Sequence, residues 1–281
     1  DLALSRHVCT FFEAYWQDKF SKNVLPLRVG HDVATINEVM GVVEILSSRR
    51  EYTKASPLVV LLGKGNHQIT SSWADEDVAE VETTLGITRS NLTFVGTGKG
   101  STTILGGFGI ENVENITFKN MTVTNTSENG HGIYIKIYMS NAEVELMDVA
   151  IKRCDGAGLH IPSTYSTSAT TLVATRCEFA NNHSGVEVRG SLNSAKFKNC
   201  IFHDNFSDGI RGLGSVIHLH GEATAVHSNG RNGIYAFHSR NNNGYSIGKV
   251  IIHLPSHHNT SYNNGVEDRY NNGQGITNVE D

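Results

Sequence analysis

Aliphatic residues recur along the middle of the chain in a short phrase that begins with glycine. The phrase starts at five positions that are 26, 27, 24 and 24 residues apart. These positions are Gly132, Gly158, Gly185, Gly209 and Gly233. The same phrase occurs upstream at Gly86 and Gly109, and downstream at Gly275 after a gap of 42 residues. This near-constant period indicates a repeat protein, in which each repeat stacks on its neighbours.

Alternating apolar and polar residues between these glycines predict short β-strands. Leu58–Leu62 is a continuous apolar run, which predicts a buried strand at the start of the repeats. Longer strands are expected at residues 92–95, 116–123, 144–151, 172–179, 197–202, 216–226 and 250–254. A repeat that contains only strands cannot bury its own apolar side. The pattern therefore predicts an all-β solenoid with parallel strands and one continuous core.

The amino-terminal part of the chain has a helical period instead. Residues 2–20 carry apolar side chains at intervals of three and four, and a second such stretch runs from Asp32 to about Arg50. Asp32 is the expected N-cap of this second helix, and residues 25–29 are expected to form a short strand before it. The chain should thus begin with helices that cover the end of the solenoid.

This change of period sets the domain boundaries. We expect a helical cap over residues 1–56 and a solenoid over residues 57–281, whose last repeat carries a long insertion at about 240–274. A solenoid that ended at Asp281 would expose an unpaired strand edge. We therefore expect further sequence, a partner chain or a second copy of this chain to cover the last coil.

Two phrases near the start of the repeats resemble a known family. Residues 91–107 and 115–125, with their Asn-Leu-Thr-Phe and Asn-Ile-Thr-Phe openings, are similar to the coils of the pectin-lyase-like superfamily. The resemblance implies an all-β, right-handed parallel β-helix with an amino-terminal α-helical cap. Lyases, hydrolases, esterases, epimerases and binding modules all use this fold, so the resemblance implies the fold and not one activity.

A second resemblance lies at the amino end. The stretch from Leu2 to Trp16, with Val8-Cys9 followed by aromatic residues, is similar to the closing helix of an F-box. It implies a relation to eukaryotic proteins, including algal ones, in which a β-helix follows an F-box. Only the last third of an F-box would be present.

The phase of the glycine phrase separates core positions from surface positions. Side chains alternate between the two faces of a strand, so the residue directly after each glycine and the next one point to opposite sides. The aliphatic residues after the glycines are expected in the core, and they are Ile133, Leu159, Val186, Ile210 and Ile234. The outward column is then Tyr134, His160, Glu187, Arg211 and Tyr235.

This column is the candidate functional site, and two functions are open for it. The favoured one is a non-catalytic binding or scaffold module that recognises a protein or a glycan through the outward face. The residues expected to bind are Lys136, Glu187, Arg189 and Tyr235. A solvated face on which Glu187 and Arg211 merely pair across adjacent coils is the inert alternative.

The other function follows from the resemblance to β-helix enzymes that act on uronic-acid polymers. It would be lyase or epimerase chemistry on an acidic polysaccharide, with Tyr134, His160 and Arg211 as the catalytic set. Tyr134 or His160 would move the proton, while the cationic side chains would hold substrate carboxylates and Tyr235 would stack on a sugar ring. Gly130-His131-Gly132 is similar to a polygalacturonase phrase, but the paired aspartates of those enzymes have no match upstream.

Two further groups of polar residues stand out. His218 and His220 lie on one face of a predicted strand, and the next long strand places His253 beside His218, which is a candidate zinc or copper site. The competing interpretation is a ladder of stacked neutral histidines. Four residues before a glycine come Asn181, Asn205 and Asn229, which are expected to stack as a structural ladder at one corner.

The net charge, the lengths of the apolar runs and the cysteine spacing exclude several classes of protein. The net charge is −5 with scattered lysine and arginine residues, so nucleic-acid binding by bulk electrostatics is not expected. No apolar run of about 18 residues predicts a membrane span, and no motif requires a cofactor. The cysteines match no zinc or redox spacing, and we expect reduced core residues at Cys9, Cys154, Cys177 and Cys200. Reduced thiols favour a cytoplasmic location, or secretion if a signal peptide was removed.

Overall fold

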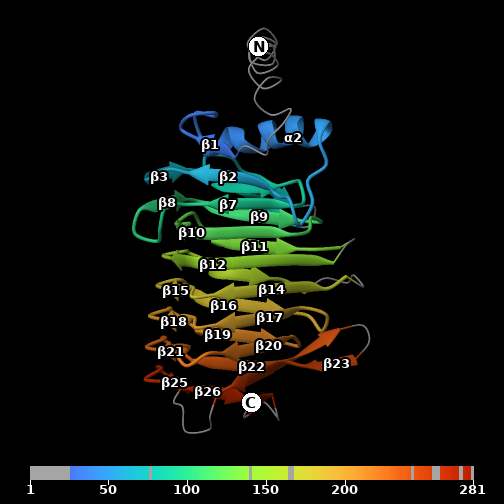
Figure 1. Ribbon diagram of the computed structural model, residues 1–281. Coiled ribbons are helices and arrows are strands. Elements are labelled where there is room, and N and C mark those ends of the chain that lie inside the picture. The colour runs from blue at the N-terminus through green and yellow to red at the C-terminus, as the bar shows by residue number, and fades with distance from the viewer. Residues whose placement is uncertain are drawn as a thin grey trace.

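The structure of the 281-residue chain is a computed structural model. It describes residues 26–75, 78–138, 141–163, 168–241, 244–254, 260–271 and 275–279. The strands stack into a parallel β-solenoid of about seven turns with a short helix across its amino-terminal end (Figure 1). The predicted all-β parallel β-helix with a helical cap is thus confirmed. The helix expected at residues 2–20, and with it the F-box resemblance and Cys9, lies outside the described residues.

Three parallel ladders run along the solenoid, and we call them faces A, B and C. Face A pairs each long strand with its equivalent in the next coil. In order of pairing, face A consists of β1 (Leu27–Val29), β2 (Leu58–Leu62), β7 (Leu92–Val95), β10 (Ile116–Thr124), β12 (Ala142–Lys152), β14 (Thr170–Thr175), β17 (Ser194–Lys198), β20 (Val216–His220), β24 (Lys249–His253) and β27 (Ile276–Asn278).

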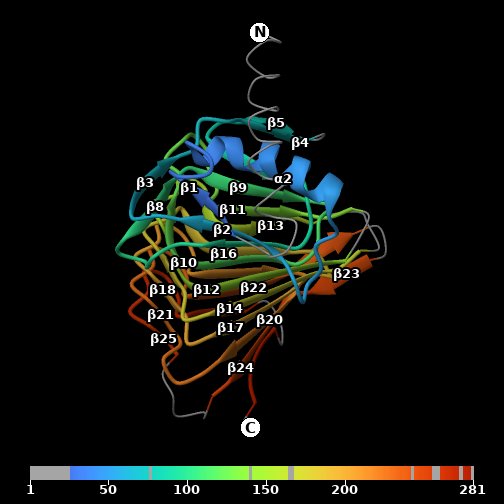
Figure 2. The same cartoon turned by 45° about the horizontal axis from the view of Figure 1, so that its top comes forward.

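Faces B and C complete each coil (Figure 2). Face B contains the second halves of β10 and β12 together with β3 (Gly65–Gln68), β8 (Thr102–Leu105), β15 (Glu178–Ala180), β18 (Ile201–His203), β21 (Ala225–His227) and β25 (Ser261–Tyr262). Face C contains β6 (Thr84–Ile87), β9 (Gly107–Glu111), β11 (Ile133–Lys136), β13 (Ala157–Ile161), β16 (Ser184–Arg189), β19 (Ile210–Leu213), β22 (Ile234–Asn241) and β26 (Arg269–Asn271). Two antiparallel additions are β4 (Trp73–Asp75) with β5 (Val78–Val81), and β22 with β23 (Gly244–Ile247).

Three strands that the sequence predicted as continuous are each divided in two. The chain bends from face A to face B at residues with positive φ, which are Arg176 (53°), Asn199 (54°) and Gly221 (84°). A left-handed residue bends the backbone, and strand pairing stops at each of these three bends. At the equivalent bends in β10 and β12, Asn120 and Asp148 are also left-handed, but there the strand continues through the bend. Cys177 and Cys200 follow these bends as buried free thiols, and Cys154 is also buried and free, as expected.

Stacked phenylalanine rings fill the interior. Phe118 lies 5.4 Å from Phe94 and 4.8 Å from Phe108 between ring centroids, and farther along Phe179 stacks on Phe202 at 5.0 Å. All five rings are fully buried. Equivalent core positions therefore meet from coil to coil, and each coil buries the apolar side that it could not cover alone.

The helical cap begins one turn later than predicted. The 3-10 turn η1 (Ile36–Glu38) leads directly into α2 (Val39–Arg49), and the N-cap position of η1 is Thr35. Asp32 instead accepts a hydrogen bond from the backbone N–H of Arg28 at 2.9 Å. The buried residues of α2 belong to the solenoid core. Figure 1 shows the helix lying across the first coil. In the described part of the chain, no helix has the length and apolar character to cross a membrane.

The register corrects the outer members of the glycine series. Gly109 pairs with Tyr134, and Gly86 pairs with Gly109, so both glycines occupy the outward column and not the start of the phrase. Gly275 precedes β27, which belongs to face A. The face C strand below β22 is β26, and β25 pairs with β21. Among the described residues of the expected insertion at about 240–274, β24, β25 and β26 pair with the preceding coil, and β22 and β23 form an antiparallel hairpin.

A ladder of buried asparagine amides stabilises the corner between faces B and C. The amide oxygens of Asn205, Asn229 and Asn264 each accept a hydrogen bond from the backbone N–H of the ladder member in the preceding coil, at 3.0, 3.2 and 3.1 Å. The first member is Asn182 and not Asn181, which is exposed and has a φ of 56°. Asn181 forms the turn itself, which explains the error of one residue.

Candidate functional site

The outward column of face C has the register that the sequence predicts. Each member pairs directly with the next, in the order Tyr134, His160, Glu187, Arg211 and Tyr235, and Tyr270 continues it on β26. The five aliphatic residues that precede the first five members are fully buried, as expected. We call these six column residues, with the side chains that touch them, the strip. Adjacent coils are about 4.8 Å apart, so the strip is a continuous line of polar and aromatic groups.

Trp73 covers the amino-terminal end of the strip. A Cβ atom built on Gly86 would lie 2.5 Å from Cδ1 of Trp73, and one built on Gly109 would lie 2.6 Å from its Cδ2. The indole therefore rests on two glycines in the outward column, where any side chain would displace it. One ring face lies against the sheet, and the ring centroid is 5.5 Å from that of Tyr134.

His131 and His160 form a hydrogen-bonded pair beside Tyr134. Nδ1 of His131 accepts a hydrogen bond from the backbone N–H of Ala157 at 3.0 Å, and Nε2 of His131 lies 3.1 Å from Nδ1 of His160. Burial lowers the pKa of His131. Burial also lowers the pKa of His160 well below its usual value, and electrostatic interactions with His131, Arg189 and Arg211 add to this effect. Both rings are therefore neutral at pH 7.

The backbone contact fixes the tautomers of this pair. Since Nδ1 of His131 accepts a hydrogen bond, its proton is on Nε2, which donates to Nδ1 of His160. The proton of His160 is then on Nε2, an atom that is buried and has no hydrogen-bond partner. A neutral imidazole in this tautomer has no free lone pair, so His160 cannot accept a proton in this arrangement.

The centre of the strip is a charged cluster. Glu187 is 7% exposed and pairs with Arg189 on its own strand, and its Oε2 is 3.8 Å from Nη1 of Arg211 in the next coil. The side chains of Arg189 and Arg211 are 42% and 34% exposed. Two guanidinium groups thus share one carboxylate, which leaves the cluster with a net positive charge. The pairing that the inert alternative predicts is present, but it involves two cations.

Tyr235 cannot stack on a sugar as expected. The guanidinium carbon of Arg211 lies 5.4 Å from the centre of its ring, and the ring of Tyr270 lies 4.8 Å away, within 6° of parallel. Both faces of Tyr235 are thereby covered, so a ligand meets its edge and hydroxyl group. Burial raises the pKa of this hydroxyl, which therefore stays protonated at neutral pH.

Lys136 is the predicted binding residue that the structure does not place on the surface. It is 6% exposed, and its Nζ lies 4.8 Å from the centre of the Tyr138 ring. The strand alternation holds, because Ile135 and Ile137 on either side are the core residues, so Lys136 is on the outward side but covered. Its contact with a ligand stays a prediction. Of the predicted site residues on face C, the structure brings together Tyr134, His160, Glu187, Arg189, Arg211 and Tyr235.

The three candidate metal ligands come together on face A, away from the strip. His220 pairs with His253, and His218 pairs with Ile251, so the predicted register is off by two residues. Nδ1 of His218 nevertheless lies 2.9 Å from Nε2 of His253. Burial lowers the pKa of His218, with contributions from the charges of His253 and Lys196.

Sequence reasoning did not include Trp73, His131 and Tyr270 in the site. The signal for Trp73 was the glycine at two successive column positions, which marks a place where another side chain lies close to the backbone. His131 is in the turn before β11, so no strand period reveals it. Tyr270 was hidden because the last glycine phrase belongs to another face.

Comparisons with known proteins yield similarity of shape only. Neither a protein-family model nor a curated protein sequence matches the chain. A pectin methylesterase in complex with a hexasaccharide aligns with 89% of this chain and 82% of its own, at 12% identity and a TM-score of 0.49. The A-module of a mannuronan C-5 epimerase from Azotobacter vinelandii aligns with 90% and 97%, at 12% identity and a TM-score of 0.33. A pectate lyase from Xanthomonas campestris aligns with 92% and 80%, at 14% identity and a TM-score of 0.35. No residue role is carried over from these enzymes at such identities.

Proposed function

We propose that the strip is a non-catalytic binding surface for an extended acidic glycan. The observation that carries the proposal is the cluster of Arg189 and Arg211 around the single buried carboxylate of Glu187. Guanidinium groups bind carboxylates in a planar, bidentate manner, and both of these groups are partly exposed. A net positive site is unusual in a chain with a net charge of −5, and it suits an anionic ligand.

The aromatic end of the strip defines a second contact. Trp73 is partly exposed, and we expect its indole to contact a sugar ring, which presents C–H groups to aromatic surfaces. Four coil steps separate the column position of Gly109 from that of Arg211, which corresponds to about 19 Å at about 4.8 Å per step. A ligand that reaches both contacts must therefore be an oligomer.

Binding is favoured over catalysis because the acid–base groups of the strip are already engaged with one another. His160 is a neutral donor, and Glu187 is paired with two cations. Proton abstraction next to a sugar carboxylate requires a group with a free lone pair near the reacting carbon. Neither residue offers one without rearrangement of the strip.

Calorimetric titration with oligogalacturonate and oligomannuronate, against neutral oligosaccharides of the same length, tests the proposal. We expect binding of at least one acidic series, no binding of the neutral ones, and about a tenfold or larger loss for Arg211→Gln. Arg176→Gln is the matched control, because Arg176 forms a comparable exposed pair with Asp148 on another part of the solenoid. Its affinity should equal that of the wild type.

Two outcomes would overturn the proposal. Time-dependent appearance of unsaturated or epimerised sugars, abolished by His160→Gln, would assign the strip to an enzyme. Absence of binding to every acidic oligomer, together with a protein partner whose binding is lost in Arg211→Gln, would assign it to a protein interface.

A further inference from the structure

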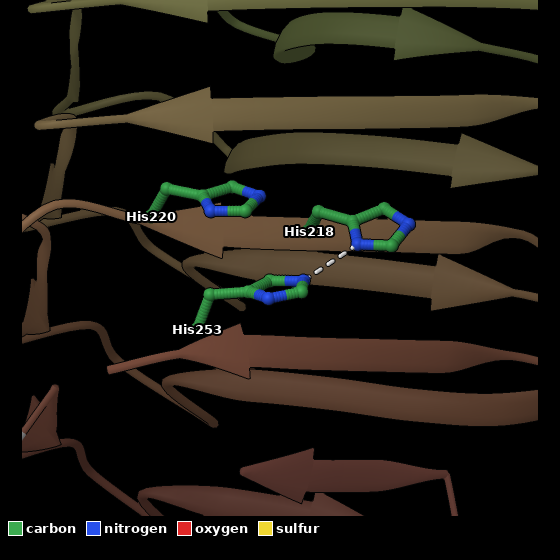
Figure 3. A group of neighbouring side chains, drawn as sticks. All are labelled: His218, His220 and His253. Carbon is green, nitrogen blue, oxygen red and sulfur yellow. Dashed lines mark hydrogen bonds between the residues drawn. The ribbon is translucent and has the colours of Figure 1, made fainter. Parts of the chain in front are cut away.

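Three imidazole rings from two adjacent strands meet on face A. His218 and His220 are two residues apart on β20, so their side chains leave the same side of the strand, and His253 on β24 lies directly opposite His220. Figure 3 shows the three rings close together, with two from β20 and one from β24. All three residues are partly exposed, so an ion in solution can reach them.

The ring nitrogens are close enough to converge on one ion. One ligand nitrogen from each ring can be chosen so that all lie within 4.8 Å of one another. A tetrahedral zinc ion with metal–nitrogen distances of about 2.0–2.1 Å requires nitrogens about 3.3 Å apart. Nδ1 of His218 and Nε2 of His253 are 2.9 Å apart and share a proton in the hydrogen bond that Figure 3 marks. A metal ion would replace that proton.

Modest rotations of the rings complete the site. His220 and His253 are now stacked at 4.0 Å and 9°, an arrangement that directs their in-plane lone pairs past each other. Rotation about the side-chain bonds of partly exposed residues is easy compared with movement of the paired strands that carry them. The backbone therefore holds the three ligands within reach, and the rings supply the adjustment.

A second histidine stack on the solenoid serves as an internal comparison. On face B, the rings of His203 and His227 stack at 5.2 Å, and the next position below them is Tyr262, at 5.1 Å from His227. That column offers two imidazoles and a tyrosine. Among the described residues, the one group of three histidine, cysteine or acidic side chains with convergent ligand atoms is the set on face A.

We propose that His218, His220 and His253 form a binding site for a divalent transition-metal ion, with zinc as the expected occupant. Neutral imidazole ligands select zinc, copper or nickel over magnesium and calcium, which prefer oxygen. Three histidines leave one coordination position open for water or a ligand atom. The site is on face A and the strip is on face C, so this proposal stands independently of the proposed function.

Two lysine side chains in the neighbouring coil should weaken metal binding at the site. Lys196 and Lys198 on β17 pair with His218 and His220, and both lysines are exposed. Their charges oppose a cation at the site, but solvent screens them. Lys198→Gln should therefore tighten metal binding by about two- to fivefold.

Calorimetric titration of the untagged full chain with zinc chloride tests the proposal. We expect one ion per chain, and each of His218→Ala, His220→Ala and His253→Ala should weaken binding more than about 100-fold, since even an outer-shell partner is worth about 10–100-fold. Cobalt(II) should give the intense visible absorption of a tetrahedral site, and magnesium should not bind. His227→Ala is the matched control and should leave the affinity unchanged.

The zinc titrations either support the proposed site or overturn it. Loss of binding in the three variants alone, with tighter binding in Lys198→Gln, supports the site. No zinc binding by the wild type, or equal weakening by His227→Ala, would overturn it and leave the three rings as a structural stack. Circular dichroism of each variant verifies that its β-sheet content is retained, which excludes unfolding as the cause.

Discussion

Replacement of Asn205 by alanine should destabilise the solenoid more than replacement of any exposed polar residue. The side chain of Asn205 makes four hydrogen bonds in a corner where the residue is 1% exposed. Its Oδ1 accepts from the backbone N–H and the amide of Asn182, and its Nδ2 donates to Phe179 and Asn229. The ladder thus connects three successive coils through this one residue.

The magnitude follows from what the substitution leaves behind. The Asn182 backbone N–H becomes a buried donor without its partner, which costs about 1–3 kcal/mol. The three other hydrogen bonds contribute about 0.5–1.5 kcal/mol each, though they are not independent. We expect a loss of about 3–4 kcal/mol in the free energy of unfolding, a large part of the about 5–15 kcal/mol that a typical domain has.

Urea denaturation of wild type and variant, followed by circular dichroism and tryptophan fluorescence together, measures this loss. Coincident transitions by the two probes would show that the all-or-none treatment applies to this repeat protein. Asn181→Gly is the control, because Asn181 is exposed, has a φ of 56° and lies outside the ladder. It should change stability by no more than about 0.5 kcal/mol. A loss below about 1 kcal/mol for Asn205→Ala, or an equal loss for the control, would refute the reasoning.

Three further predictions concern the strip and the core. Gly109→Val should push the Trp73 indole off the sheet, because a Cβ there would lie 2.6 Å from the ring. In a Trp16→Phe background, iodide should then quench the fluorescence of Trp73 more strongly. Unchanged quenching would contradict this prediction. The pKa values of His131 and His160 are lowered in the folded state, so below about pH 6.5 the unfolded chain binds protons that the folded chain does not. The free energy of unfolding should therefore fall as the pH decreases from about 6.5 towards the folded pKa values, by up to about 1.4 kcal/mol per pH unit for each group. A His160→Asn variant should show a flatter pH dependence in the same urea assay, and an identical slope would argue against the neutral pair. Burial raises the pKa of the Cys154 thiol to about 12, so it should resist alkylation until the protein unfolds, and rapid labelling of the native chain, located by mass spectrometry, would disprove this.

Most of the fold could be predicted from the repeat period in the sequence. The aliphatic residue after each glycine, from Ile133 to Ile234, is buried because strand alternation and coil stacking leave it no other side. That phase also fixed the outward column from Tyr134 to Tyr235. Errors appeared where the phrase itself changes position, at Gly86, Gly109 and Gly275, because a glycine–aliphatic pair looks the same on any face.

The chemistry of the site was less accessible from the sequence than its location. The neutral state of His160 depends on a turn residue, His131, and on a backbone N–H, and neither follows a strand period. The exposure of Lys136 was also misjudged, because the strand period gives the side to which a residue points and not what covers it there; Lys136 is 6% exposed and lies beside Tyr138. Trp73 comes from an antiparallel hairpin outside the repeats, so only the glycines beneath it indicated its place.

The most direct test of the strip is the dependence of affinity on ligand length. Calorimetry with acidic oligosaccharides from one to eight sugars should give weak binding for short members. The affinity should rise steeply once the ligand spans about 19 Å, the separation of Arg211 from Gly109, on which Trp73 rests. Trp73→Ala should remove this rise while it leaves the weak binding of short acidic sugars intact. Affinity that is independent of length, or a rise that persists in Trp73→Ala, would contradict the account.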